Sequence, residues 1–347
     1  MINFCTLFDS NYLARGLALY ESLINYSPSF HLYVLTFDEK TFQYLSQQNL
    51  EHLTPIALRD FEDEELLRVK PSRTAAEYCW TCTPSLVLYC VMKFNLPSCT
   101  YIDADMIFYH NPQLLLDEGD GCSILISPHN YTRDYDESAT HGTYCVQFMY
   151  FKNDSEGILA LRWWRERCIE WCHAYLEDGK FGDQRYIEDW PTRFQKVHVM
   201  QHPGGGLAPW NLQQYEVMVN DKRINLTRRR DPTTYPLVFF HFHGLKFYTD
   251  EMVSCTGPLY EIDAEVKKLI YFPYITRLLQ LDKKLRAEGV NFDSNGAQQE
   301  APSKQKTYIQ FMKDLLIAIG RGRFFLISFK KFNFKLHNHF YPTRLFK

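Results

Sequence analysis

The feature that most restricts the fold of this chain is the alternation of strand-like and helix-like segments at its start. Residues 2–8 (INFCTLF) and 31–37 (HLYVLTF) are apolar runs typical of buried strands. Between them, residues 12–26 repeat apolar side chains at helical spacing, and a polar helix is expected after the second run. A strand, a helix and a second strand in this order predict parallel strands in an α/β layer architecture.

The same patterns predict the remaining elements. We expect helices at residues 84–95 and 156–177, and strands at residues 100–105, 122–128, 143–151, 197–200 and 237–243. A chain of 347 residues with 46% hydrophobic and 23% charged residues can bury a large core. We therefore predict one α/β domain over residues 1–290.

The C-terminal part of the chain has a different composition. Residues 291–306 are polar and are expected to form a linker. Residues 307–347 interleave aromatic and basic side chains, and residues 315–347 contain seven Lys or Arg and no Asp or Glu. A basic, aromatic, amphipathic helical tail of this kind is typical of segments that lie on an anionic membrane surface. A helix packed on the preceding domain is the main alternative, and nucleic-acid binding is the less favoured one, so no nucleic-acid partner is expected.

The sequence pattern gives no signal for export or for membrane spanning. No basic region followed by an apolar stretch opens the chain, and no run approaches the roughly 20 apolar residues of a spanning helix. The ten cysteines favour free thiols in a reducing compartment, and the CxxC of Cys79 and Cys82 has no second pair at zinc spacing. We therefore expect a cytoplasmic protein that is peripheral at the inner face of the cell membrane.

The strongest chemical signal is YIDADMIFYHNP at residues 101–112. Asp103 and Asp105 stand at the carboxyl end of a predicted strand, where open α/β sheets bind ligands. Two such carboxylates can hold one hard cation whose other positions a diphosphate fills, which implies Mn²⁺ or Mg²⁺. The alternative is a polar turn that caps the next helix.

A second signal is LVFFHFHGLK at residues 237–246. A neutral imidazole from His241 or His243 suits Mn²⁺ as a third protein ligand. If the strand stays extended, only one of the two histidines can face the metal, and the other is structural. Gly244 would let the backbone approach a phosphate, and Lys246 would offset diphosphate charge.

Three further segments carry candidate residues for a sugar or acceptor site. In GDQRYIEDWP (182–191), Asp183 also fits as the N-cap of a helix, which is the structural alternative. Three consecutive glycines in HPGGGLAPWN (202–211) permit a close backbone approach, and Trp210 could face a pyranose or pack in the core. The candidates from these segments and from the strand end at ISPH are His129, His202, Gly205, Trp210 and Asn211.

The order of four motifs resembles a known group of enzymes. DSNY (9–12), DAD (103–105), GDQ (182–184) and HFxG (241–244) are similar to the retaining glycosyltransferases of the GT-A fold, the family of glycogenin and the bacterial lipopolysaccharide galactosyltransferases. A closer resemblance is to uncharacterised bacterial nucleotide-sugar transferases that carry TYIDAD, GDQ, HPGxxLAPWN and FHFHG. The resemblance spans about residues 1–250 and implies a GT-A fold, that is, a Rossmann-like nucleotide-diphospho-sugar transferase.

The resemblance also implies roles for the matching residues. Asp103, Asp105 and His241 would hold the metal, and Asp183 and Gln184 would act beside the donor sugar as catalytic residues. The implied nucleotide-binding residues are Thr6, Asp9, Asn11, Tyr12, Ala104, Gly244 and Lys246. Gln147 and His243 join the candidates for the sugar or acceptor site.

Three departures from the family pattern stand out. The lysine of the family comes three residues after the glycine, whereas Lys246 comes two after Gly244. The family's Asn-Ala-Gly is here Cys-Val-Gln at residues 145–147, which leaves the donor sugar open. An arginine before the acidic motif is missing, with Lys93 as a substitute.

These features predict a metal-dependent glycosyltransferase. The expected donor is a nucleotide-diphosphate sugar, with UDP as its nucleotide, and the expected acceptor is a lipid-linked or lipopolysaccharide-type glycan, with retention of configuration. A metal-dependent phosphohydrolase and a catalytically inert nucleotide- or glycan-binding protein are the alternatives.

Overall fold

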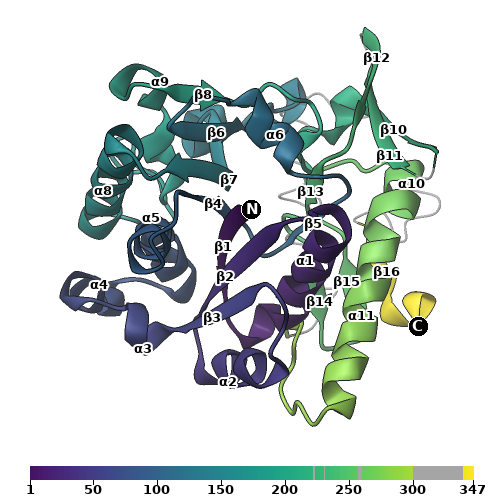
Figure 1. Ribbon diagram of the computed structural model, residues 1–347. Coiled ribbons are helices and arrows are strands. Elements are labelled where there is room, and N and C mark those ends of the chain that lie inside the picture. The colour runs from purple at the N-terminus through teal and green to yellow at the C-terminus, as the bar shows by residue number, and fades with distance from the viewer. Residues whose placement is uncertain (222, 230, 257–259, 300–338) are drawn as a thin grey trace.

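The computed structural model describes residues 1–221, 223–229, 231–256, 260–299 and 339–347. In this part of the chain a seven-stranded sheet forms the centre of the molecule, and helices cover both of its faces (Figure 1). The strand order is β3 (Leu53–Ala57), β2 (Phe30–Thr36), β1 (Ile2–Phe8), β4 (Ser98–Ile102), β7 (Tyr144–Lys152), β6 (Ile124–Pro128) and β8 (Val197–Val199). β7 is antiparallel to both of its neighbours and the other pairs are parallel, so the sheet is mixed. The predicted α/β fold class is confirmed, with β7 as the exception to parallel pairing.

Helices of the two faces come from different parts of the chain. One face is covered by α5 and α8, the other by α1 and α11 (Figure 1). The helices of the described residues are α1 (Leu13–Tyr26), α2 (Glu39–Gln48), α3 (Leu58–Phe61), α4 (Glu64–Val69), α5 (Ala75–Lys93), α6 (Gln113–Glu118), α7 (Ser138–His141), α8 (Ser155–Glu170), α9 (Trp190–Arg193), α10 (Ala264–Val266) and α11 (Phe272–Ala287).

The sheet separates two apolar cores because successive side chains of a strand point to opposite faces. Phe4 and Leu32 lie in the core on the α1 and α11 side. Their neighbours Cys5 and Tyr33 lie in the core on the α5 and α8 side. The continuous apolar runs of β1 and β2 thus reflect strands that are buried on both faces.

Two predicted helices have different ends in the structure. The helix predicted at residues 84–95 begins earlier, at Ala75, because Thr74 and Glu77 form a capping box at its start. The helix predicted at residues 156–177 ends at Glu170, and Trp171 is extended. The chain leaves the helix there because the backbone N–H of Ala174 donates to Glu77 of α5.

Three smaller sheets extend the described fold. β5 (Met106–Phe108) pairs with β13 (Phe239–His241), which also pairs with β9 (Gly205–Leu207). β10 (Tyr215–Asn220), β11 (Arg223–Arg228) and β12 (Asp231–Pro236) form an antiparallel sheet. The last sheet joins β14 (Lys246–Tyr248), β15 (Met252–Ser254) and β16 (Phe340–Pro342).

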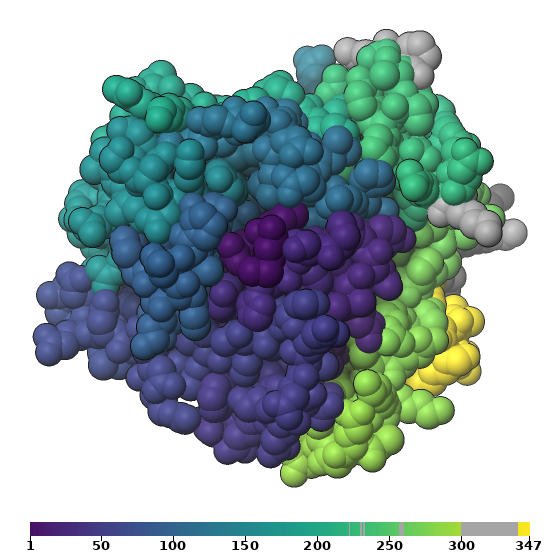
Figure 2. All heavy atoms as spheres, in the orientation of Figure 1, coloured from purple at the N-terminus to yellow at the C-terminus, as the bar shows by residue number. Residues whose placement is uncertain are grey.

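The described parts of the C-terminal region contact the domain. In the segment expected as a linker, Ser294 is buried and its carbonyl oxygen accepts from the Ala14 N–H. The yellow C-terminal residues lie beside the green of α11 in Figures 1 and 2, where Phe346 packs on Phe272. Residues 300–338, which hold most of the predicted tail, lie outside the described residues.

Searched over the described residues, no helix combines the length and the apolar character that crossing a membrane requires. All ten cysteines are free thiols, including Cys79 and Cys82 on α5.

Candidate functional site

Asp103, Asp105 and His241 converge beyond the end of the central sheet. β4 ends at Ile102, and the two aspartates occupy the turn into β5. β13 pairs antiparallel with β5, which brings His241 opposite Met106. The Nε2 atom of His241 lies 3.1 Å from Oδ1 of Asp105 and 3.7 Å from Oδ2 of Asp103. One ligand atom from each residue lies within 4.8 Å of the others.

The charges of this cluster support one another. Burial alone would lower the pKa of His241, but the charge of Asp105 and a hydrogen bond to it raise that pKa well above the usual value. Burial likewise opposes ionisation of Asp105, yet His241 lowers the pKa of this carboxyl to about 2. Burial raises the pKa of Asp103. Asp103 and Asp105 supply two carboxylate ligands, and His241 supplies an imidazole. The negative charge of the carboxylates favours a positive ion between them, so this set fits a divalent cation such as Mn²⁺ or Mg²⁺.

The cluster lies at the floor of a cavity of about 620 Å³. Asp9, Tyr12, Asp183 and Gln184 also line this cavity. This volume is in the range of small-molecule and cofactor sites. The structure thus gathers, at one cavity, residues from four motifs that are far apart in the sequence.

On the N-terminal side, Asp9 and Tyr12 reach the cavity but two neighbours do not. The carboxylate of Asp9 accepts from the backbone and side-chain nitrogens of Asn11 at 3.0 and 2.9 Å, and Asn11 itself does not line the cavity. The side chain of Thr6 is fully buried within β1, away from the cavity lining. The Tyr12 ring is 38% exposed and offers a flat surface at the cavity wall.

Arg15 is a residue that the sequence analysis missed. Its guanidinium group is buried, lies 4.4 Å from the Tyr12 ring centroid, and is close enough to Asp105 to favour its ionised form. It donates to the carbonyl oxygens of Asn295 at 2.9 Å and Leu245 at 3.2 Å. A charged residue within the apolar stretch LARGLAL was the available signal. Lys93, considered as a substitute for the family's arginine, is exposed at the end of α5.

Asp183 does not cap a helix with its side chain. It precedes the short 3-10 helix η4 (Gln184–Ile187), has helical backbone angles and makes no capping hydrogen bond. Burial and the negative charge of Asp103 raise the pKa of its carboxyl to about 8. Asp183 is therefore largely protonated at neutral pH and can donate a hydrogen bond into the cavity.

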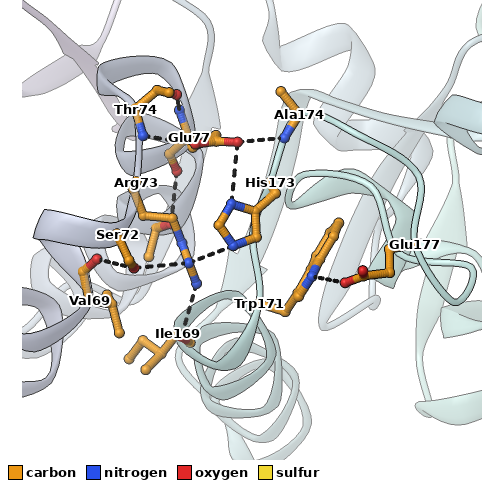
Figure 3. A network of polar contacts seen from close by, with 11 residues as sticks. Val69, Ser72, Arg73, Thr74, Glu77, Ile169, Trp171, His173, Ala174 and Glu177 are labelled. Carbon is orange, nitrogen blue, oxygen red and sulfur yellow. Dashed lines mark hydrogen bonds and ion pairs between the residues drawn. The ribbon is translucent and has the colours of Figure 1, made fainter.

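The segment after α8, which leads along the chain to Asp183, is held to α5 by a polar network (Figure 3). Glu77 of α5 accepts from the backbone nitrogens of Thr74 and Ala174 at 2.8 Å each. His173 lies 3.3 Å from the same carboxylate and 2.8 Å from Arg73. The indole of Trp164 on α8 donates to the carbonyl oxygen of Asp183 at 2.9 Å, which links Asp183 to α8.

The aromatic and histidine candidates divide into two groups. His129, Trp210 and His243 line the cavity, with the rings of His129 and Trp210 at 5.3 Å. Burial lowers the pKa of His129 to about 3 and that of His243 to about 4, so both imidazoles are neutral. His241 and His243 both face the cavity because β13 ends at His241, so the alternation of an extended strand does not apply.

Of the remaining candidates, most do not line this cavity. Asn211 is buried and bonds the carbonyl oxygens of His129 and Gly206 at 2.8 and 2.9 Å. His202 accepts from the Gly204 N–H, and Gly205 packs in the core. Ala104 lines the cavity, whereas Gln147, Gly244 and Lys246 are outside its lining.

Gly244 has a φ of 80°, a left-handed conformation that favours glycine. Lys246 begins β14 with an exposed side chain.

Comparison with known proteins gives two sequence relatives. No family model matches the chain. The uncharacterized protein YfnD of Bacillus subtilis (strain 168) is 32% identical over 284 residues, which cover 80% of this chain and 88% of YfnD. The uncharacterized protein YfnF of the same organism is 32% identical over 252 residues, which cover 70% of this chain and 81% of YfnF.

Among solved structures, the galactosyltransferase LgtC in complex with donor and acceptor sugar analogs is similar over 83% of this chain and 100% of its own. The sequence identity is 12% and the TM-score is 0.48.

Proposed function

We propose that this chain, which belongs to the family of the Bacillus subtilis proteins YfnD and YfnF, is a metal-dependent glycosyltransferase. The donor would be a nucleotide-diphosphate sugar, with UDP as its nucleotide. The acceptor would be a glycan, such as a lipid-linked or lipopolysaccharide-type oligosaccharide. The reaction would proceed with retention of configuration.

The observation that carries the proposal is the convergence of Asp103, Asp105 and His241 at the floor of the cavity. Two carboxylates and an imidazole would hold Mn²⁺ or Mg²⁺, which supplies a Lewis acid for the leaving diphosphate when bound. The Tyr12 ring at the cavity wall supports a site for the nucleoside base.

Asp183 and Gln184, which also line the cavity, support the sugar position. A largely protonated Asp183 would donate a hydrogen bond to a sugar hydroxyl. The amide oxygen of Gln184 would stabilise positive charge that develops at the anomeric carbon. Neither group needs to remove the acceptor proton, because in a retaining reaction the departing phosphate oxygen lies on the same face and can accept it.

The acceptor side is supported by aromatic rings at the cavity. His129 and Tyr131 are stacked at a centroid distance of 4.5 Å, and Trp210 packs against both. Flat aromatic faces suit the C–H surfaces of pyranose rings, so this part of the cavity would take the acceptor glycan.

The proposal predicts that the acidic pair is required for metal-dependent donor binding. Asp103→Asn and Asp105→Asn should each abolish Mn²⁺-dependent binding of UDP while the variants stay folded, because both residues lie in the turn between β4 and β5 and neither forms part of an apolar core. Isothermal titration calorimetry with UDP, with and without Mn²⁺, measures this directly. Asp120→Asn, an exposed aspartate in the turn before β6, is the matched control. Unchanged Mn²⁺-dependent binding by the Asp103→Asn, Asp105→Asn double variant would refute the metal assignment.

Product analysis separates the proposed activity from its rivals. Transfer of labelled sugar from the donor to a glycan supports the glycosyltransferase. Release of free phosphate would point to a phosphohydrolase, and donor binding without turnover over a panel of glycan acceptors would point to an inert binding protein.

A further inference from the structure

We propose that Gln147, with Gly206 behind it, is a positioning residue for the metal ligands, and that this is the role of the HPGGGLAPWN motif. The inference rests on the metal site proposed above. It concerns how the chain holds Asp103 and His241 in place before any ligand binds.

Gln147 contacts two of the three proposed ligands. Its side-chain Oε1 lies 2.8 Å from Nδ1 of His241, and its backbone carbonyl oxygen accepts from the Asp103 N–H at 3.1 Å. Gln147 is fully buried in β7, between the acidic turn after β4 and the histidine of β13. One residue thereby fixes the spacing of ligands that come from distant parts of the sequence.

The side-chain contact also decides which nitrogen of His241 is available. An amide oxygen can only accept a hydrogen bond, so Nδ1 of His241 must carry a proton. In the neutral form of the ring, the form that can bind a metal, the lone pair then lies on Nε2, the atom that faces Asp105 and Asp103. A hydrogen-bond acceptor behind the second nitrogen is the arrangement that orients metal-binding histidines and makes them better ligands.

Because Gly206 has no side chain, it leaves space for the side chain of Gln147. A Cβ atom at residue 206 would lie 2.9 Å from Nε2 of Gln147, and the φ of Gly206 is +106°, where other residues are strained. Asn211 donates to the Gly206 carbonyl oxygen at 2.9 Å and holds this backbone in place. The rings of Trp210 and His241 pack edge to face, with centroids at 5.5 Å and an interplanar angle of 90°. The motif therefore leaves space for the Gln147 side chain at Gly206, fixes the backbone through Asn211 and packs Trp210 against His241.

The test compares Mn²⁺ affinities of the purified protein, measured without substrate by titration calorimetry and by the electron paramagnetic resonance of free Mn²⁺. Gln147→Met keeps the size of the side chain and removes the acceptor, so Mn²⁺ should bind about 10- to 100-fold more weakly. Gln147→Glu keeps an oxygen acceptor and should retain affinity within a few-fold of the wild type. Gly206→Ala should weaken Mn²⁺ binding in the same direction as Gln147→Met.

The matched control for Gly206→Ala is Gly121→Ala. Gly121 also has a left-handed φ, of +81°, but an added Cβ would meet no atom within 4 Å. Gly121→Ala should lower the thermal midpoint through backbone strain and leave Mn²⁺ affinity unchanged.

The outcomes separate this inference from the proposed function. If the wild-type protein binds no Mn²⁺, the proposed function fails and this inference fails with it. If the wild type binds Mn²⁺ and Gln147→Met binds it equally well, the positioning role is wrong and the metal site stands. Equal losses of Mn²⁺ affinity in Gln147→Met and Gln147→Glu would show that Gln147 contributes only packing, and would overturn the inference.

Discussion

At the scale of single residues, burial determines the protonation states of two histidines that line the cavity. Burial lowers the pKa of His129 to about 3 and of His243 to about 4, which makes both imidazoles weak bases. His202, another candidate for the sugar or acceptor site, does not line the cavity. An inverting enzyme needs a strong general base beside the acceptor hydroxyl. The low pKa values of His129 and His243 therefore make both poor candidates for such a base.

A retaining mechanism predicts a specific kinetic defect for Gln184→Ala. If its amide oxygen stabilises charge mainly in the transition state, turnover should fall by roughly 10²- to 10³-fold while donor affinity changes little. Initial rates and calorimetric donor affinities, measured on the same preparation, test this pattern. The NMR coupling constant of the anomeric proton in the product tests the stereochemistry. A product inverted relative to the donor would remove Gln184 from this role.

At the scale of elements, one buried carboxylate, that of Glu77, links α5 to the segment after α8. Burial opposes ionisation of Glu77, but the N–H groups of Thr74 and Ala174 lower its pKa from 4.5 to about 2. A carboxyl whose pKa is lower in the folded state adds stability that is present above its unfolded pKa and is lost as the pH falls. The link between α5 and the segment after α8 should therefore weaken between about pH 4.5 and pH 2.

Glu77→Gln should reveal this contribution. At neutral pH the variant should lose about 2 kcal/mol of unfolding free energy, because a charged acceptor of buried N–H groups becomes a neutral one. Its stability should also fall less steeply than that of the wild type between pH 4.5 and pH 2. Urea titrations across this pH range measure both effects. Parallel pH profiles of the two proteins would show that Glu77 does not make this contribution.

Elements marked by a continuous or regularly repeated apolar pattern could be predicted from the sequence. Element ends that depend on tertiary contacts could not. The strands β1, β2 and β7 lie within one residue of their predicted ranges because their runs are buried on both faces. The end of α8 depends on Glu77, almost one hundred residues earlier, and no local pattern reports such a contact.

The residues of the candidate site divide in the same way, into those that a local motif predicts and those that only tertiary contacts bring together. Asp103, Asp105 and His241 stand in motifs whose chemistry is local, and these residues do lie together. The contact of Gln147 with His241 and that of Arg15 with Asn295 join segments that only the fold brings together.

At the scale of the whole molecule, the basic C-terminal segment should control attachment to membranes. Replacing Arg321, Arg323, Lys330, Lys331 and Lys335 by Gln should weaken co-sedimentation with anionic vesicles, since each basic residue near such a surface contributes about 1 kcal/mol. Transfer to short soluble acceptors should not change.

This variant is preferable to truncation because residues 339–347 pack on the domain, with β16 paired to β15. Vesicles of neutral lipid and high salt are the controls. Co-sedimentation that is insensitive to the five substitutions would contradict a membrane role for the segment.

The described residues on either side of residues 300–338 contact the same small sheet. Before this segment, the Gln298 N–H donates to the Phe247 carbonyl oxygen on β14 at 2.9 Å. After it, β16 pairs with β15 of the same small sheet. The two flanks of residues 300–338 therefore join one sheet, and β14 begins two residues after Gly244 of the histidine loop. Any contact made by residues 300–338 would act on the domain at one place, beside the loop that carries His243.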